Sequence, residues 1–312
     1  MVFGQKGGVI PLFKNLLACF PLCGLLTGFA SPSSAERLPG STNASDPLSP
    51  PAESIWSPST WSRESKTEML NTAVIGGMAA YGLLFWGYGG HSFQFANEGW
   101  FQRDSIHGGA DKLGHAFSTY VGAMAYGSVY DRWGYSPREA SLYGALSSFA
   151  TFFMIEFGDA FSRHGFSLED LVMDASGALW GYLRREHPRF RELVDYRVSY
   201  FPSYGTLKGR TSDYISDYSG FKYLLAFKCS GIRALSSSWM RYLELYGGYF
   251  TRGYETQDLD HYGDPHRSGF IGVGINLPLL FKEQGWRKTS AFLDFFQPPY
   301  TFVSAKHRFD GP

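Results

Sequence analysis

Charge is scarce in this chain and is evenly balanced. The 312 residues include 28 basic and 28 acidic side chains, so the formal net charge is zero and charged residues make up only 18%. This balance argues against nucleic-acid binding, which needs a concentrated basic surface. Aromatic residues also reach 18%. Such a composition is typical of a protein whose surface meets lipid or a protein partner.

Cysteine and the common catalytic motifs are also scarce. Of the three cysteines, only Cys229 lies beyond the first 35 residues, which excludes an intrachain disulfide and a cysteine-based metal cluster from the rest of the chain. The sequence lacks a Gly-x-Ser-x-Gly elbow, a phosphate loop, a dinucleotide-binding glycine pattern and a His-Glu-x-x-His zinc helix. We therefore expect no bound nucleotide and a fold held together by packing.

The first 35 residues have the pattern of an export signal. Lysines near the start are followed by an uncharged, mostly apolar run at 16–30, and Ser33 and Ala35 stand at cleavage-site spacing. The residues before Cys19 are also similar to a lipoprotein cleavage box, so lipidation is an alternative. Either reading predicts export to the bacterial cell envelope, to the periplasm or outer membrane, with the inner membrane as an alternative.

The composition changes three times along the chain and predicts four segments. These are a signal peptide at 1–35, a disordered Ser- and Pro-rich linker at 36–64, a helical bundle domain at 65–188 and a strand-rich C-terminal region at 189–312. The predicted fold class is therefore α+β, an apolar four-helix bundle followed by a small antiparallel sheet.

Apolar runs and capping residues predict the helices. Neither 69–96 nor 113–130 contains Asp, Glu, Lys or Arg, so both runs are apolar enough to enter a bilayer or to be buried in protein. Ser136 and Ser167 each precede an acidic residue at capping spacing and predict the starts of the third and fourth helices. Beyond them, Ile271, Val273, Ile275 and Leu277 alternate with small or polar residues as in a strand, and 221–227 and 242–249 are similarly strand-like. We expect four or five antiparallel strands.

Acidic and histidine residues recur at the ends of these apolar helices. Asp111 and His115 lie one turn apart at the start of the second helix, and Glu156 and Asp159 close the third. In the fourth helix Asp170 and Asp174 lie one turn apart. In an antiparallel bundle these ends meet. The candidate catalytic residues are Asp111, His115, Glu156, Asp159 and Asp174.

Two readings of these residues remain open. Imidazole and carboxylate groups suit Zn, Mn or Fe, which makes His115, Glu156, Asp159 and Asp174 possible ligands of a divalent metal that could activate water. Without a metal, neighbouring carboxylates could divide acid and base roles. The alternative is a structural network in which His115 bonds a carboxylate and fixes the register of the bundle.

The motifs at 111–117, 156–162, 165–170 and 174–177 resemble those of the YfiM-like family of predicted bacterial periplasmic lipoproteins. The resemblance extends over about 95–230 and includes 209–220. A looser likeness to VanZ-like membrane proteins rests on the Asp-Lys-x-x-His helix start. Both imply an envelope location and a helical core, and neither implies a reaction.

Three functions follow as hypotheses. The first is an envelope protein with a structural or interaction role, whose bundle is fixed by the polar network. The second is a metal-dependent hydrolase acting on a lipid or cell-wall substrate. The third is a lipid-binding module that uses the aromatic sheet. The expected partners are membrane lipid or another envelope protein.

Overall fold

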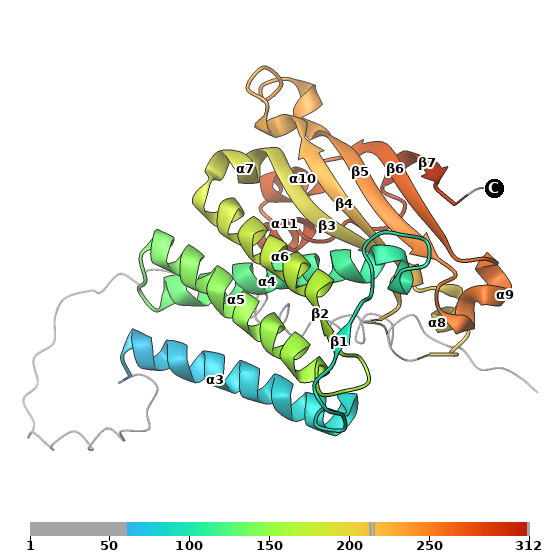
Figure 1. Cartoon of the computed structure of the whole chain (residues 1–312). Helices are drawn as coiled ribbons and strands as arrows, with labels where there is room; N and C mark the ends of the chain where they lie inside the picture. Colours follow the sequence, from blue (N-terminus) through green and yellow to red (C-terminus); the bar gives the residue numbers. More distant parts are fainter. Residues whose placement is uncertain (1–60, 212–213, 215, 311–312) are drawn as a thin grey trace, which may run out of the picture.

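A layer of four long helices lies against a five-stranded antiparallel sheet (Figure 1). The computed structural model describes residues 61–211, 214 and 216–310. The predicted signal peptide, the candidate lipidation residue Cys19 and nearly all of the predicted linker lie outside the described residues. In the described part a helical region precedes the sheet, so the predicted α+β class is confirmed.

Two of the four long helices begin where the capping residues Ser136 and Ser167 predict. The four are α3 (Arg63–Tyr81), which continues as the π-helical η1 (Gly82–Trp86), α4 (Ala110–Arg132), α5 (Pro137–Asp159) and α6 (Leu168–Glu186). Ser136 and Glu139 form a complete capping box at the start of α5. The hydroxyl of Ser167 accepts the backbone N–H of Asp170 at the start of α6.

Helix α4 is the centre of the helical layer, with α5 and α6 packed against it. Gly177 of α6 allows this approach, because a Cβ there would overlap the carbonyl oxygen of Ala116 in α4. On its other side α4 contacts the sheet, where Phe117 and Tyr120 join a core cluster with Tyr196 and Tyr223. The helices are therefore held close by small residues on one side and by aromatic residues on the other.

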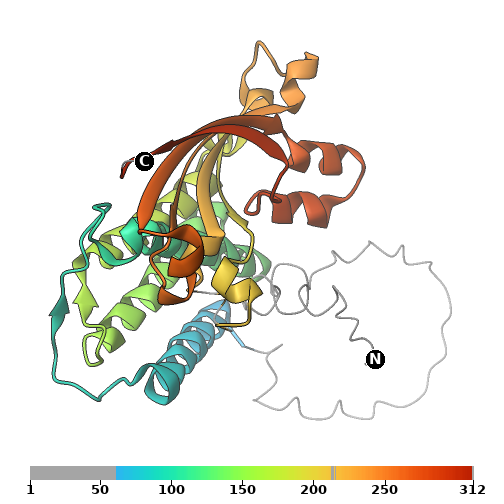
Figure 2. The same ribbon diagram turned by 90° about the vertical axis from the view of Figure 1, so that its right-hand side faces the viewer.

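Helix α3 lies on the side of the helical layer that is away from the sheet (Figures 1 and 2). It runs beside α5, and within the described part of the chain none of its residues is buried. Polar contacts tie its first turns down, including one between Thr67 and the Tyr135 hydroxyl at 3.0 Å. By length and composition alone, Arg63–Trp86 and Pro137–Asp159 could each cross a membrane.

The sheet has the strand order β3-β4-β5-β6-β7 and curves over the helical layer (Figure 2). Its strands are β3 (Val194–Tyr200), β4 (Phe221–Lys228), β5 (Leu243–Arg252), β6 (His266–Ile275) and β7 (Phe302–Arg308). The short helix α7 (Pro188–Leu193) leads from α6 into β3. Further short helices lie between the strands: α8 (Tyr204–Leu207), α9 (Leu259–Tyr262), α10 (Leu277–Glu283) and α11 (Arg287–Leu293). A separate two-residue parallel pair, β1 (Phe95–Ala96) with β2 (Phe166–Ser167), ties the 87–109 loop to the start of α6.

The alternating residues of β6 form an exposed apolar row with their neighbours. Phe227, Leu245, Val273 and Val303 stand directly opposite one another across β4 to β7, and each is exposed. The predicted alternation stops at Ile275 and does not reach Leu277. The reason is local: the Asn276 side chain accepts the N–H of Leu279 and caps α10, so Leu277 is helical.

Candidate metal centre

The polar ends of the helices meet at one end of the helical layer, as the antiparallel arrangement predicts. The start of α4, the end of α5 and the start of α6 supply most of the side chains, and the 87–109 loop adds one more carboxylate. A buried Asp/His/Glu network therefore exists in the helical region. It divides into two halves, one centred on Lys112 and one on His115.

In the first half a buried ammonium is surrounded by carboxylates. Lys112 is 0% exposed, and its Nζ lies 2.9 Å from Asp111 Oδ2 and 2.9 Å from Asp170 Oδ1. It also donates to Glu98 Oε2. Burial alone would lower the pKa of Lys112, but the three acids raise it. Burial raises the pKa of Glu98 to about 7, with a contribution from the charge of Asp170.

In the second half the centre is a histidine. His115 Nδ1 lies 3.2 Å from Asp174 Oδ1 and 3.7 Å from Glu156 Oε1. One donor atom each from these three residues falls within 4.8 Å of the others. The Thr119 hydroxyl donates to Asp174 Oδ1 at 2.8 Å, and Asp174 Oδ2 has no hydrogen-bond partner among the described residues. The three side chains could therefore ligate one ion, with a free carboxylate oxygen available.

The pKa values of His115 and Glu156 both lie above their ordinary range, for different reasons. Burial alone would lower the pKa of His115, but its hydrogen bond to Asp174 and the charge of Asp170 raise it, to about 10. Burial raises the pKa of Glu156 to about 8, although His115 opposes the rise. Without an added cation, a protonated His115 and a protonated Glu156 therefore keep the half close to neutral.

The remaining predicted residues lie at the edge of the His115 half or outside it. Asp111 belongs to the Lys112 half. Asp159 lies outside the set of three donors; its carboxylate accepts from the Ser162 hydroxyl at 3.5 Å, and burial raises its pKa to about 6. His164, which lies in the connection between α5 and α6, is exposed.

Sequence reasoning missed several side chains at this end of the molecule. Glu98 and His107 come from the 87–109 loop, which has no periodicity to mark them. His107 adopts a left-handed backbone conformation (φ 49°), and its Nδ1 lies 3.7 Å from Glu255 Oε1. Such strain is often found at functional positions. Lys112 offered a usable signal, because a lysine in an apolar helix needs partners nearby.

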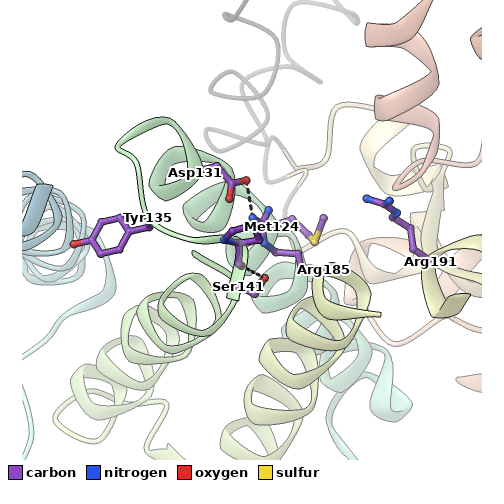
Figure 3. A pocket seen from close by; sticks show the side chains of 7 residues that line it. Met124, Asp131, Tyr135, Ser141, Arg185 and Arg191 are labelled. Atoms are coloured by element: carbon purple, nitrogen blue, oxygen red, sulfur yellow. Dashed lines mark hydrogen bonds and ion pairs between the residues drawn. The ribbon is translucent and has the colours of Figure 1, made fainter. Parts of the chain in front are cut away.

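A hollow of about 470 Å³ lies at the opposite end of α4 (Figure 3). Arg185 and Asp131 face each other in it, with their side chains 2.7 Å apart, and Arg191 stands to one side. None of the predicted site residues lines this hollow. The hollow and the acidic network are therefore separate features.

Comparison with known proteins locates the network within a family. Residues 97–186 match the model of a family described as "Predicted periplasmic lipoprotein (DUF2279)". The chain is similar to that family over this stretch. It holds both halves of the network, from Glu98 to Asp174, and it stops short of α3 and the sheet. The predicted family resemblance is confirmed over this stretch, while the 209–220 motif falls outside the match. No curated protein and no solved structure matches the chain.

Proposed function

We propose that this envelope protein binds a divalent cation through His115, Glu156 and Asp174. The observation that carries the proposal is a difference between the two halves of the network. In the Lys112 half, the chain itself supplies the ammonium that its carboxylates need. In the His115 half, two carboxylates and the nearby Asp159 face only an imidazole. A divalent ion would displace the protons of His115 and Glu156 and balance the charge of these carboxylates in their place.

The donor set suits such an ion. One imidazole nitrogen and two carboxylate oxygens are ligands for Zn, Mn or Fe, and a site with three protein ligands keeps a coordination position for water. His115 is 23% exposed, so the site borders on solvent, whereas Asp174 is fully buried. Support also comes from the orphaned oxygen of Asp174, because a buried carboxylate oxygen without a partner is costly.

Hydrolysis is the reaction class that this arrangement favours. A bound metal would lower the pKa of its water and make it a nucleophile near neutral pH. The carboxyl of Asp159, which lies close enough to His115 to feel its charge, could exchange protons with this water. An envelope location, proposed from the family description and the predicted signal, limits the substrates at hand to lipids and cell-wall material.

A purely structural role is the second candidate, and the Lys112 half favours it. Three carboxylates on one ammonium tie the 87–109 loop, α4 and α6 together. The bond from Thr119 to Asp174 adds another link between α4 and α6. On this reading His115 stays protonated and paired with Asp174, and the site takes up no metal.

Metal titration of the full chain separates the two. After dialysis against a chelator, the protein is titrated calorimetrically with Zn²⁺, Mn²⁺ and Mg²⁺, and its melting temperature is measured with each ion. We expect one site, a raised melting temperature with at least one ion, and loss of binding in His115→Ala and Glu156→Gln. Glu98→Gln, which removes a buried carboxylate from the Lys112 half, is the matched control and should still bind. Absence of binding in the parent protein, or equal loss in the control, would overturn the proposal.

A further inference from the structure

Exposed apolar side chains gather at the end of the helical layer that also holds the acidic network. They come from η1, from the loop after it and from the end of α5. We refer to these residues as the apolar tip: Leu83, Leu84, Phe85, Phe93, Phe95 and Phe157. The first three are 63%, 75% and 67% exposed, values that are unusual for consecutive large apolar residues.

The tip is one connected surface. The ring of Tyr88 lies against both Gly82 of η1 and Gly158 of α5, and its hydroxyl donates to the carbonyl oxygen of Ile155 at 3.0 Å. The Phe161 ring is 5.4 Å from that of Phe157 and 5.6 Å from that of Phe93. These contacts hold the three segments in fixed positions, so the exposed side chains are presented together.

Charge is segregated away from the tip. All four charged residues of α3 lie in its first two turns, at 63, 64, 66 and 68, and 69–96 contains no Asp, Glu, Lys or Arg. Helix α3 and η1 together run for 24 residues. A helix that is apolar on every side is normally buried, yet in the described part of the chain α3 contacts mainly α5 on one side. Nothing among the residues that the structure describes therefore covers the tip.

The direction of the side chains decides what kind of partner fits. Consecutive residues of a helix point about a quarter of a turn apart, so Leu83, Leu84 and Phe85 together face roughly half of the circumference of η1. The flat interface of a second protein copy covers one side of a helix. A lipid phase surrounds a protruding tip on all of its exposed sides. Tyr81 and Trp86 beside the tip are residue types that favour the boundary between lipid and water.

We infer that the apolar tip inserts into the surface of a lipid bilayer, without spanning it. Because Phe157 follows Glu156 directly, insertion would bring the candidate cation centre to the level of the lipid headgroups. The inference deepens the proposed function by naming amphiphilic lipid as the substrate class, but insertion itself rests on the tip alone and does not require a metal.

Vesicle binding tests the inference. The full chain, carrying Cys19→Ala so that no lipid can be attached there, is mixed with vesicles of phosphatidylethanolamine and phosphatidylglycerol and floated on a density gradient. The tip variant is Leu83→Ser, Leu84→Ser and Phe85→Ser together. The matched control is Leu245→Ser, Val273→Ser and Val303→Ser, which removes three exposed apolar residues from the sheet. Circular dichroism confirms that both variants fold.

We expect the parent and the control to float, and the tip variant to lose at least about ten-fold in vesicle affinity. Equal flotation of the tip variant and the parent would overturn the inference. Failure of the parent to bind vesicles would also overturn the inference. So would the finding that the tip variant only converts a dimer to a monomer, because a second copy of the chain would then cover the tip. Metal titration of the tip variant reports on the cation site independently.

Discussion

Replacing Lys112 by Met would leave three buried carboxylates without the ammonium that they share. Glu98, Asp111 and Asp170 surround Lys112 Nζ, and the lysine is fully buried. Methionine has a similar length and fills the same volume, so the substitution removes the charge while largely preserving the packing. Removing one partner of a buried ion pair typically costs about 3–5 kcal/mol, and we expect a loss of that size in the free energy of unfolding.

The loss should shrink on acidification. Burial already raises the pKa of Glu98 in the folded state to about 7 although Lys112 opposes the rise, so removal of Lys112 raises the pKa of this carboxyl further. For carboxyls shifted in this direction, the penalty is present above the folded-state pKa and fades as the pH falls through it. The difference from the parent should therefore be largest at pH 7 and smaller near pH 5.

Urea unfolding followed by circular dichroism at both pH values measures the effect. Lys282→Met removes an exposed lysine of α10 and should change the stability by no more than about 0.5 kcal/mol. A second variant, Lys112→Met with Glu98→Gln, should regain part of the loss because one fewer carboxylate is left unpaired. Equal stabilities of Lys112→Met and Lys282→Met at pH 7 would refute the charge argument.

Two further predictions concern the packing of the sheet and the helices. Burial alone would raise the pKa of Asp195, but Arg184 and other cations lower it, to about 2. Asp195 therefore contributes about 2 kcal/mol to the free energy of unfolding, which is fully present above about pH 4 and is lost as the pH falls toward 2. Asp195→Asn should flatten this part of an acid-unfolding curve. An unchanged slope would contradict the prediction. Gly177→Ala should lower the free energy of unfolding, measured by thermal unfolding, by about 1–3 kcal/mol, because the added Cβ would overlap the Ala116 carbonyl. Gly76→Ala places its Cβ in open space and should stabilise the protein by about 0.5–1 kcal/mol. Similar effects at the two glycines would contradict the packing described for α4 and α6.

The helical half of the molecule was predictable because its signals are local. Ser136 and Ser167 mark helix starts through hydrogen bonds to residues three positions on, so their sequence context is sufficient. The convergence of Glu156 with His115 and Asp174 then follows from the antiparallel order of consecutive helices. What could not be predicted is the division of the network, because that depends on which carboxylates the Lys112 side chain reaches.

The sheet and the loop were harder to predict, for physical reasons visible in particular residues. Strand β3 contains Asp195 and Arg197, both fully buried, so its sequence lacks the alternation of a half-exposed strand. They are stabilised by partners far along the chain, such as Glu244 on β5, and no local pattern reports such a pairing. No local sequence pattern predicts the position of Glu98 either, because its place in the network depends on the path of the 87–109 loop in space.

The central claim is that His115, Glu156 and Asp174 bind one divalent ion. A crystal structure of the full chain soaked in Mn²⁺, with anomalous diffraction data, tests it most directly. The account predicts one anomalous peak within about 2.0–2.3 Å of His115 and of both carboxylates. A peak in the Lys112 half instead, or no peak at a metal concentration that saturates binding in solution, would contradict it.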